Sequence, residues 1–296
     1  MEYFCLDCPR RCGAKRSDDL PGGFCASPAL PRAARAAAHF GEEPCISGTR
    51  GAGTIFFCGC NLRCVYCQNR EISRGAAIGT PLSVEALREL MLRLRDTGVH
   101  NIELVTPTHY ARAICAALDG LALGVPVVWN SSGYESVETL RRLEGLVQVY
   151  LPDCKYSSPA LAKRYSAAED YPAAAAAAIR EMFRQTGPYR LDENGLLVSG
   201  VLIRHLILPG EIENSMGVID FAAESFPKGS VLFSLMSQYT PMPGLERFPS
   251  LRRRVDPEEN AHLIRYMQRC GIEDGYWQEP DSATVESIPA FDGTGL

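Results

Sequence analysis

The sequence has no apolar run long enough to cross a membrane as a helix. Residues 1–12 lack the apolar centre of a secretory signal peptide. There is no excess of basic residues either, because the formal net charge is −5 and no basic stretch is interleaved with aromatic residues. These absences predict a cytoplasmic protein with no membrane partner, and they argue against a dedicated nucleic-acid binder.

Cysteine, in contrast, is plentiful, with 12 residues in a chain of 296. In a reducing compartment, clustered cysteines bind metal more often than they form disulfides. Their share is also below that of small disulfide-stabilised proteins. Eight of them fall in two clusters, and the isolated ones are interpreted as small buried apolar side chains. The isolated cysteines are Cys45, Cys115, Cys154 and Cys270.

Six short apolar segments alternate with amphipathic helical patterns. The predicted strands are 54–57, 101–106, 126–130, 147–151, 201–208 and 231–235. The predicted helices are 84–96, 110–122, 136–143, 172–185, 214–225 and 257–270. This alternation predicts an α/β fold with a parallel sheet, a partial (β/α)6 TIM-like barrel. The turn sequence Asp192–Gly195 predicts a hairpin within residues 189–197.

Residues 1–50 differ from the rest of the chain, because they hold five cysteines, several Pro and Gly residues, and one stretch at 31–39 that we expect to be helical. There is no internal repeat and no long disordered linker. We therefore expect a small Cys-rich metal-binding segment, 1–50, followed by a core of residues 51–296.

The most specific pattern is C-x3-C-x2-C at Cys60, Cys64 and Cys67, directly after the first predicted barrel strand. Thiolates are the usual ligands of iron–sulfur clusters, and three ligands for four irons leave one iron open for chemistry. Barrel folds place active sites at the carboxyl ends of their strands. The alternative is a structural zinc loop with Cys58 as the fourth ligand, since Cys58 in an extended segment faces the same side as Cys60.

Residues 59–69 read Gly-Cys-Asn-Leu-Arg-Cys-Val-Tyr-Cys-Gln-Asn, which resembles the signature of the radical S-adenosylmethionine (SAM) superfamily. The resemblance spans roughly residues 1–280 and points to the pyruvate formate-lyase activating enzyme group, in its PflX-like branch. It implies a 4Fe–4S cluster on Cys60, Cys64 and Cys67, whose open iron chelates SAM. Reductive cleavage then gives a 5′-deoxyadenosyl radical that abstracts hydrogen, with flavodoxin or ferredoxin as the expected reductant.

The resemblance also assigns SAM contacts to the ends of the strands. Thr106 and Thr108 follow the second strand where many members carry a Gly-Gly-Glu-like segment, so the group that binds the SAM amine is left open. Thr108 could equally cap a helix. Tyr66 is expected beside the adenine or packed in the core, and Gln238 near the ribose.

Polar residues end the third and fourth strands. By resemblance, Asn130, Ser131 and Asp153 would hold a monovalent cation and Lys155 would approach the SAM carboxylate. The alternative for Asp153 and Lys155 is a local ion pair.

On the fifth strand, Arg204 and His205 point to opposite faces. The resemblance favours Arg204 as a contact of the SAM carboxylate or ribose, and a guanidinium can hold a carboxylate through two bonds. His205 is interpreted either as inward-facing or as a core histidine.

The second cysteine cluster is Cys5, Cys8, Cys12 and Cys25, with spacing C-x2-C-x3-C-x12-C. Four thiolates make a closed site that suits structural zinc and a second iron–sulfur cluster equally. The alternative is four unconnected thiols.

Three functions are consistent with these patterns. The first is a radical SAM enzyme that activates a glycyl radical enzyme, and the second is radical SAM modification of a small molecule, an RNA or another protein side chain. The third is a non-catalytic iron–sulfur redox sensor, which would bind a cluster but no SAM. The charged strand ends argue against the sensor, because a sensor needs no charged cavity.

Overall fold

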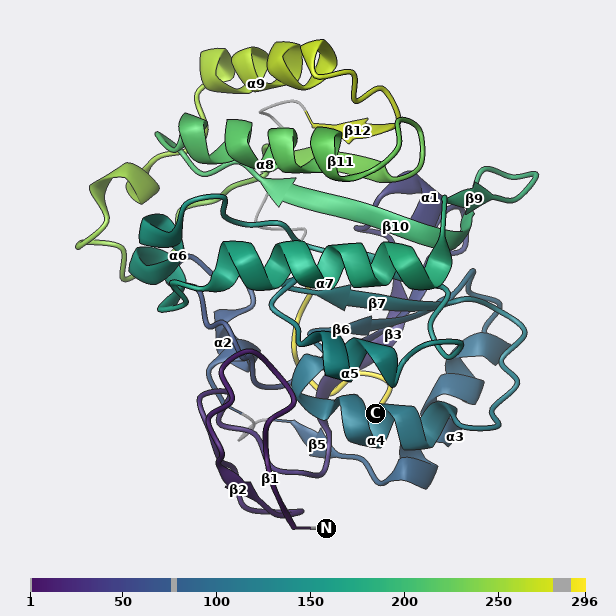
Figure 1. The fold of residues 1–296 in the computed structure, drawn as a ribbon. Helices are drawn as coiled ribbons and strands as arrows, with labels where there is room; N and C mark the ends of the chain where they lie inside the picture. Colours follow the sequence, from purple (N-terminus) through teal and green to yellow (C-terminus); the bar gives the residue numbers. More distant parts are fainter. Residues whose placement is uncertain (1, 76–78, 279–288) are drawn as a thin grey trace.

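The computed structural model describes residues 2–75, 79–278 and 289–296. Seven strands lie parallel and side by side in chain order in one large sheet (Figure 1). They are β4 (Ala52–Phe57), β6 (Ile102–Val105), β7 (Val127–Ser131), β8 (Val149–Pro152), β10 (Leu197–Leu206), β11 (Leu232–Met236) and β12 (Gly275–Trp277). The first six are the six predicted strands, so the α/β fold with a parallel sheet is confirmed. β12, at the edge of the sheet, was not predicted from the sequence.

Helices connect the parallel strands. They are α3 (Val84–Asp96), α4 (Ala111–Leu118), α5 (Val137–Arg141), α6 (Pro159–Ser166), α7 (Tyr171–Thr186), α8 (Ile212–Ser225) and α9 (Pro257–Arg269). Two helices of four residues, α1 (Pro44–Ser47) and α2 (Arg70–Ser73), and two 3-10 turns, at Thr108–Tyr110 and Pro249–Arg252, lie in the loops. The hydroxyl of Ser83 caps α3 by accepting from the Ala86 N–H. α6 was not predicted. No helix in the described ranges is long and apolar enough to cross a membrane.

The segment predicted to be helical at 31–39 is instead strand β3 (Arg32–His39), so that prediction was wrong. β3 pairs antiparallel with β4 and also with the short edge strand β5 (Thr80–Pro81). Its alanines favour a helix locally, but backbone pairing with a fully buried strand outweighs that weak preference. The division of the chain at residue 50 stays a prediction, although β3 shows that residues before it belong to the main sheet.

The predicted hairpin is present. β9 (Arg190–Leu191) pairs antiparallel with the start of β10. A carboxylate oxygen of Asp192 accepts from the N–H groups of Asn194 and Leu196, both at 2.9 Å. This is the Asx-type turn chemistry that Asp and Asn favour.

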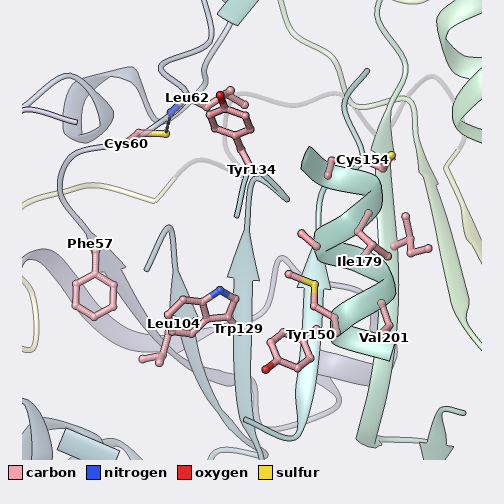
Figure 2. Packing of buried hydrophobic residues seen from close by; sticks show 14 of the residues in the cluster. Phe57, Cys60, Leu62, Leu104, Trp129, Tyr134, Tyr150, Cys154, Ile179 and Val201 are labelled. Atoms are coloured by element: carbon pink, nitrogen blue, oxygen red, sulfur yellow. Dashed lines mark hydrogen bonds between the residues drawn. The ribbon is translucent and has the colours of Figure 1, made fainter. Parts of the chain in front are cut away.

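The sheet and its helices enclose one main apolar core. Figure 2 shows Trp129 and Tyr150 on neighbouring strands, with Ile179 of α7 facing the strand that carries Val201. All four side chains are fully buried. The same core includes Cys60 and Leu62. The loop after β4 is therefore held in place by packed side chains.

Candidate active site

A cavity of about 240 Å³ opens at the carboxyl ends of the parallel strands. Its walls come from the loop after β4 and from the ends of β6, β7, β8, β10 and β11. The candidate site residues that line it are Cys60, Cys64, Tyr66, Cys67, Thr106, Asn130, Ser131, Asp153, Lys155, Arg204 and Gln238. Residues almost 180 positions apart in the sequence therefore meet in one place, where barrel folds put their chemistry.

The cysteines of the loop after β4 are surrounded by hydrogen-bond donors. The N–H groups of Leu62 and Arg63 point at Cys60 Sγ, at 3.3 and 3.5 Å, and Figure 2 marks the bond from Leu62. The hydroxyl of Ser166 on α6 donates to Cys64 Sγ at 3.0 Å. A thiol is a weak acceptor, whereas a metal-bound thiolate is a strong one. The loop therefore fits an anionic cluster bound through these sulfurs.

Cys58 does not take part in this arrangement. It packs in a separate apolar cluster with Phe56 and Ile72 and does not line the cavity. The alternative of a zinc loop completed by Cys58 is therefore not supported by the geometry.

Gly59 turns the chain from β4 into the cysteine loop. Its φ of +87° lies in the left-handed region, and a Cβ there would lie 2.0 Å from Ser27 Oγ and 2.9 Å from the Cys25 carbonyl oxygen. Only glycine fits both the backbone angle and the close approach of residues 25–27.

We expect Gly59→Ala to destabilise the protein more than Gly98→Ala does. Gly98 has the same φ of +87° but nothing within 4 Å of an added Cβ, so it isolates the backbone cost of about 1–2 kcal/mol. The Gly59 variant adds a steric clash to that cost and shifts the cysteine loop. Thermal unfolding and iron content after anaerobic reconstitution measure the two effects, and equal losses in both variants would contradict this interpretation.

Charged side chains line the same cavity as the cysteines and form a charged wall. Lys155 Nζ lies 2.6 Å from Asp153 Oδ2, and Arg204 Nε lies 3.4 Å from the other oxygen of Asp153. Burial raises the pKa of Asp153, but the two cations more than offset it, and the net shift is downward. A buried carboxylate flanked by two cations stays ionised, so this wall presents both signs of charge to the cavity.

Glu42 is a cavity residue that the sequence did not reveal. Its carboxylate lies 2.7 Å from Arg204 Nη1, across 162 positions of sequence. Burial together with repulsion from Glu103 raises its pKa to about 8, although Arg204 acts in the opposite direction. No spacing or motif marks Glu42, because it lies in the loop after β3 and reaches Arg204 only through the fold of the sheet.

Asn130 links this wall to a buried acid. Its oxygen accepts from Arg204 Nη2 at 2.5 Å, and its amide donates to Glu103 at 2.7 Å. Both ends of the amide are thus occupied by protein groups. The cation site that the resemblance implies at Asn130, Ser131 and Asp153 stays a prediction, and Arg204 already takes the Asn130 oxygen.

Of the two threonines after β6, only one lines the cavity. Thr106 lines the cavity and has a φ of +58°, which is rare and strained for a β-branched residue. Thr108 does not line it, because its hydroxyl donates to the buried Glu135 at 2.9 Å. Thr108 lies within the 3-10 turn Thr108–Tyr110, whose capping residue is Pro107 and which has no side-chain cap, so its hydroxyl neither lines the cavity nor caps a helix.

Tyr66 and His205 are both held by the core. Tyr66 borders the cavity, and its hydroxyl shares a hydrogen bond of 2.8 Å with Tyr156, which continues through Ser166 to Cys64. The ring nitrogens of His205 contact the Cys154 carbonyl and the Ser215 hydroxyl. His205 is thus a satisfied core histidine.

The N-terminal cysteines gather beside the cysteine loop. Cys5, Cys8, Cys12 and Cys25 line one small cavity next to Asn61. They lie around the short antiparallel pair β1 (Tyr3–Phe4) and β2 (Lys15–Arg16). Figure 1 shows this segment in purple beside α2.

Comparison with known proteins gives the family. The model of the Radical SAM superfamily matches residues 54–222. The chain belongs to the radical SAM superfamily. It is also 30% identical over 278 residues to a protein named Uncharacterized protein MJ0674 from Methanocaldococcus jannaschii, covering 91% of this chain and 75% of that one. As a radical SAM enzyme, it uses a 4Fe–4S cluster and SAM and requires a reductant.

Two solved structures share the fold. Streptococcus suis SuiB bound to its precursor peptide SuiA superimposes with a TM-score of 0.50 at 13% identity, over 74% of this chain and 46% of that one. HydG, a maturase of the [FeFe]-hydrogenase, gives 0.50 at 16% identity, over 73% and 49%. The chain therefore spans less than half the length of these solved proteins, and the likeness shows the fold alone.

Proposed function

We propose that Cys60, Cys64 and Cys67 hold the 4Fe–4S cluster of this radical SAM enzyme and that SAM lies in the adjoining cavity. The observation that carries the proposal is that all three cysteines and the charged wall of Asp153, Lys155 and Arg204 line one cavity. When bound, the cluster and SAM supply a 5′-deoxyadenosyl radical for hydrogen abstraction. The residues of the chain orient the two cofactors and keep water away from the cluster.

The charged wall carries groups of both signs, which suits the carboxylate and the amine of SAM. Lys155 provides a cation for the carboxylate of SAM, and Arg204 provides the guanidinium behind it. This chain lacks the Gly-Gly-Glu-like segment that many family members carry after β6. We therefore assign the binding of the SAM amine to the carboxylate of Glu42. A bound ammonium would favour the ionised form of Glu42 and so lower the pKa that burial has raised.

The remaining lining residues shape the rest of the pocket. Thr106 offers its carbonyl and hydroxyl at a strained strand end, and Gln238 offers an amide on the far side, at the end of β11. Two apolar side chains, Leu206 and Met236, also line the cavity and offer a surface for the nucleoside.

As substrate we propose a glycyl residue of a partner protein, as the activating enzymes modify. The support is the resemblance of residues 59–69 to that group, which is an argument from family. A small molecule, an RNA or another protein side chain is the alternative target.

The test combines the reduced, cluster-loaded enzyme and SAM with candidate glycyl radical enzymes and records electron paramagnetic resonance spectra. We expect a glycyl radical on the partner with wild type and none with Cys64→Ala. SAM turnover with a metabolite and no partner would instead assign a small-molecule substrate. A loaded cluster that never binds SAM would leave only the redox-sensor interpretation.

A further inference from the structure

A second, much smaller cavity lies on the other side of the cysteine loop. Its volume is about 10 Å³, which is room for one water-sized sphere and not for an iron–sulfur cluster. The residues that matter here are Cys5, Cys8, Cys12, Cys25, Asn61 and His109. None of them except Asn61 belongs to the loop that carries Cys60, Cys64 and Cys67.

Two buried polar atoms of these residues have no partner within the described part of the chain. They are Asn61 Oδ1 and His109 Nδ1, on side chains only 1% and 3% exposed. The other ring nitrogen of His109 lies 2.8 Å from the Cys58 carbonyl, and a carbonyl only accepts, so Nε2 carries the proton. Nδ1 is left as a free lone pair. A histidine fixed by a backbone carbonyl on one nitrogen is the usual form of a metal ligand.

A buried cation beside the cysteines indicates a negative charge there. Arg16 is fully buried and donates to the backbone carbonyls of Ser27, Pro28 and His109, and weakly to Cys5 Sγ at 3.8 Å. In the described ranges its guanidinium has no carboxylate partner. Burying an uncompensated cation is costly, and thiolates bound to a metal carry the compensating charge that neutral thiols lack.

We propose that this cavity binds a single Zn²⁺ through Cys5, Cys8, Cys25 and the Nδ1 atom of His109. Cys5 and Cys25 are buried and Cys8 is half-buried, whereas Cys12 is exposed. We therefore leave Cys12 out of the ligand set, because the three other cysteines and His109 already complete the four ligands of a structural zinc site. As described, no three of these side chains already lie at single-ion distance. Zinc binding would therefore bring these side chains closer together, which couples the metal to the folding and stability of the segment.

This metal ties the N-terminal segment to the cysteine loop. Arg10 donates to the Asn61 carbonyl at 2.9 Å, and Arg63 donates to the Phe24 carbonyl at 3.0 Å. Large apolar side chains of the segment, Phe4 and Leu20, are 70% and 62% exposed, so it has little core of its own. A small segment without a core is where a structural metal has its largest effect.

The test uses the full chain carrying Cys60→Ala, Cys64→Ala and Cys67→Ala, so that metal on the cluster loop does not contribute. Metal-free protein is titrated with Co²⁺ and then Zn²⁺ under anaerobic conditions, and bound zinc is measured by mass spectrometry. We expect one tightly bound Zn²⁺ per chain, a Co²⁺ spectrum of three sulfurs and one nitrogen, and a higher unfolding temperature with metal. Cys25→Ser and His109→Gln should weaken zinc binding by more than about tenfold.

Cys12→Ser and Cys115→Ser are the matched controls and should bind zinc as the background protein does. The Co²⁺ spectrum reads the ligand set without any substitution at His109, in case that variant fails to fold. A four-sulfur spectrum, with zinc lost in Cys12→Ser and kept in His109→Gln, would overturn the ligand set. Iron with acid-labile sulfide in place of zinc, or no metal at all, would overturn the proposal of a single-ion site.

Discussion

Cys64→Ala is expected to lose the 4Fe–4S cluster and all SAM cleavage. Cys64 lines the large cavity, and its sulfur accepts the hydroxyl of Ser166, so the substitution removes both a cluster ligand and the end of a hydrogen-bond chain. A cluster with two protein ligands instead of three is not retained. Iron and acid-labile sulfide per chain after anaerobic reconstitution measure the loss directly.

The matched control is Cys58→Ala, six positions away on the same loop. Cys58 is fully buried and does not itself line the cavity, although Phe56 and Ile72, with which it packs, do. This variant should lose a little stability and keep its cluster. Full iron content in Cys64→Ala, or cluster loss only in Cys58→Ala, would contradict the assignment of the ligands.

Arg204→Gln is expected to have the largest effect on stability, a loss of about 3–5 kcal/mol in the free energy of unfolding. The guanidinium is 12% exposed and lies between Glu42 and Asp153, and its removal leaves two buried carboxylates without that cation. Denaturant unfolding measures the change. SAM affinity, measured by calorimetry on the loaded enzyme, should fall as well.

Arg184→Gln is the matched control, because Arg184 also pairs with two carboxylates, Glu144 and Glu181, at 2.7 and 2.8 Å. Arg184 and Glu144 are half-exposed, so solvent screens that pair, and the buried Glu181 keeps a hydrogen bond from Gln185 when Arg184 is lost. We expect a clearly smaller loss of stability and unchanged SAM affinity. Similar losses in the two variants would show that the Arg204 network contributes no more than a surface ion pair.

The parts of the site that the sequence predicted are local or periodic. Cys60, Cys64 and Cys67 share one loop, so their spacing carries the information. Asp153 and Arg204 follow from the rule that parallel strands end at one edge, and they meet there as a parallel bridge.

The missed parts depend on contacts between distant segments. Glu42 reaches Arg204 because β3 adds to the sheet beside β4, and an alanine-rich sequence gives no hint of that pairing. Thr108 and Thr106 are two positions apart, yet only Thr106 lines the cavity, because a buried acid, Glu135, binds the other hydroxyl. Sequence periodicity places a residue at a strand end, but its partner decides which way the side chain turns.

The most direct test is SAM cleavage by the wild-type enzyme. The protein is reconstituted with iron and sulfide without oxygen, reduced, mixed with SAM, and assayed for 5′-deoxyadenosine, with SAM binding measured on the same sample. We expect the enzyme to bind SAM and to form 5′-deoxyadenosine only when both the reductant and the cluster are present. A fully loaded cluster that binds no SAM would contradict the assignment of the cavity formed by Cys60, Lys155 and Arg204.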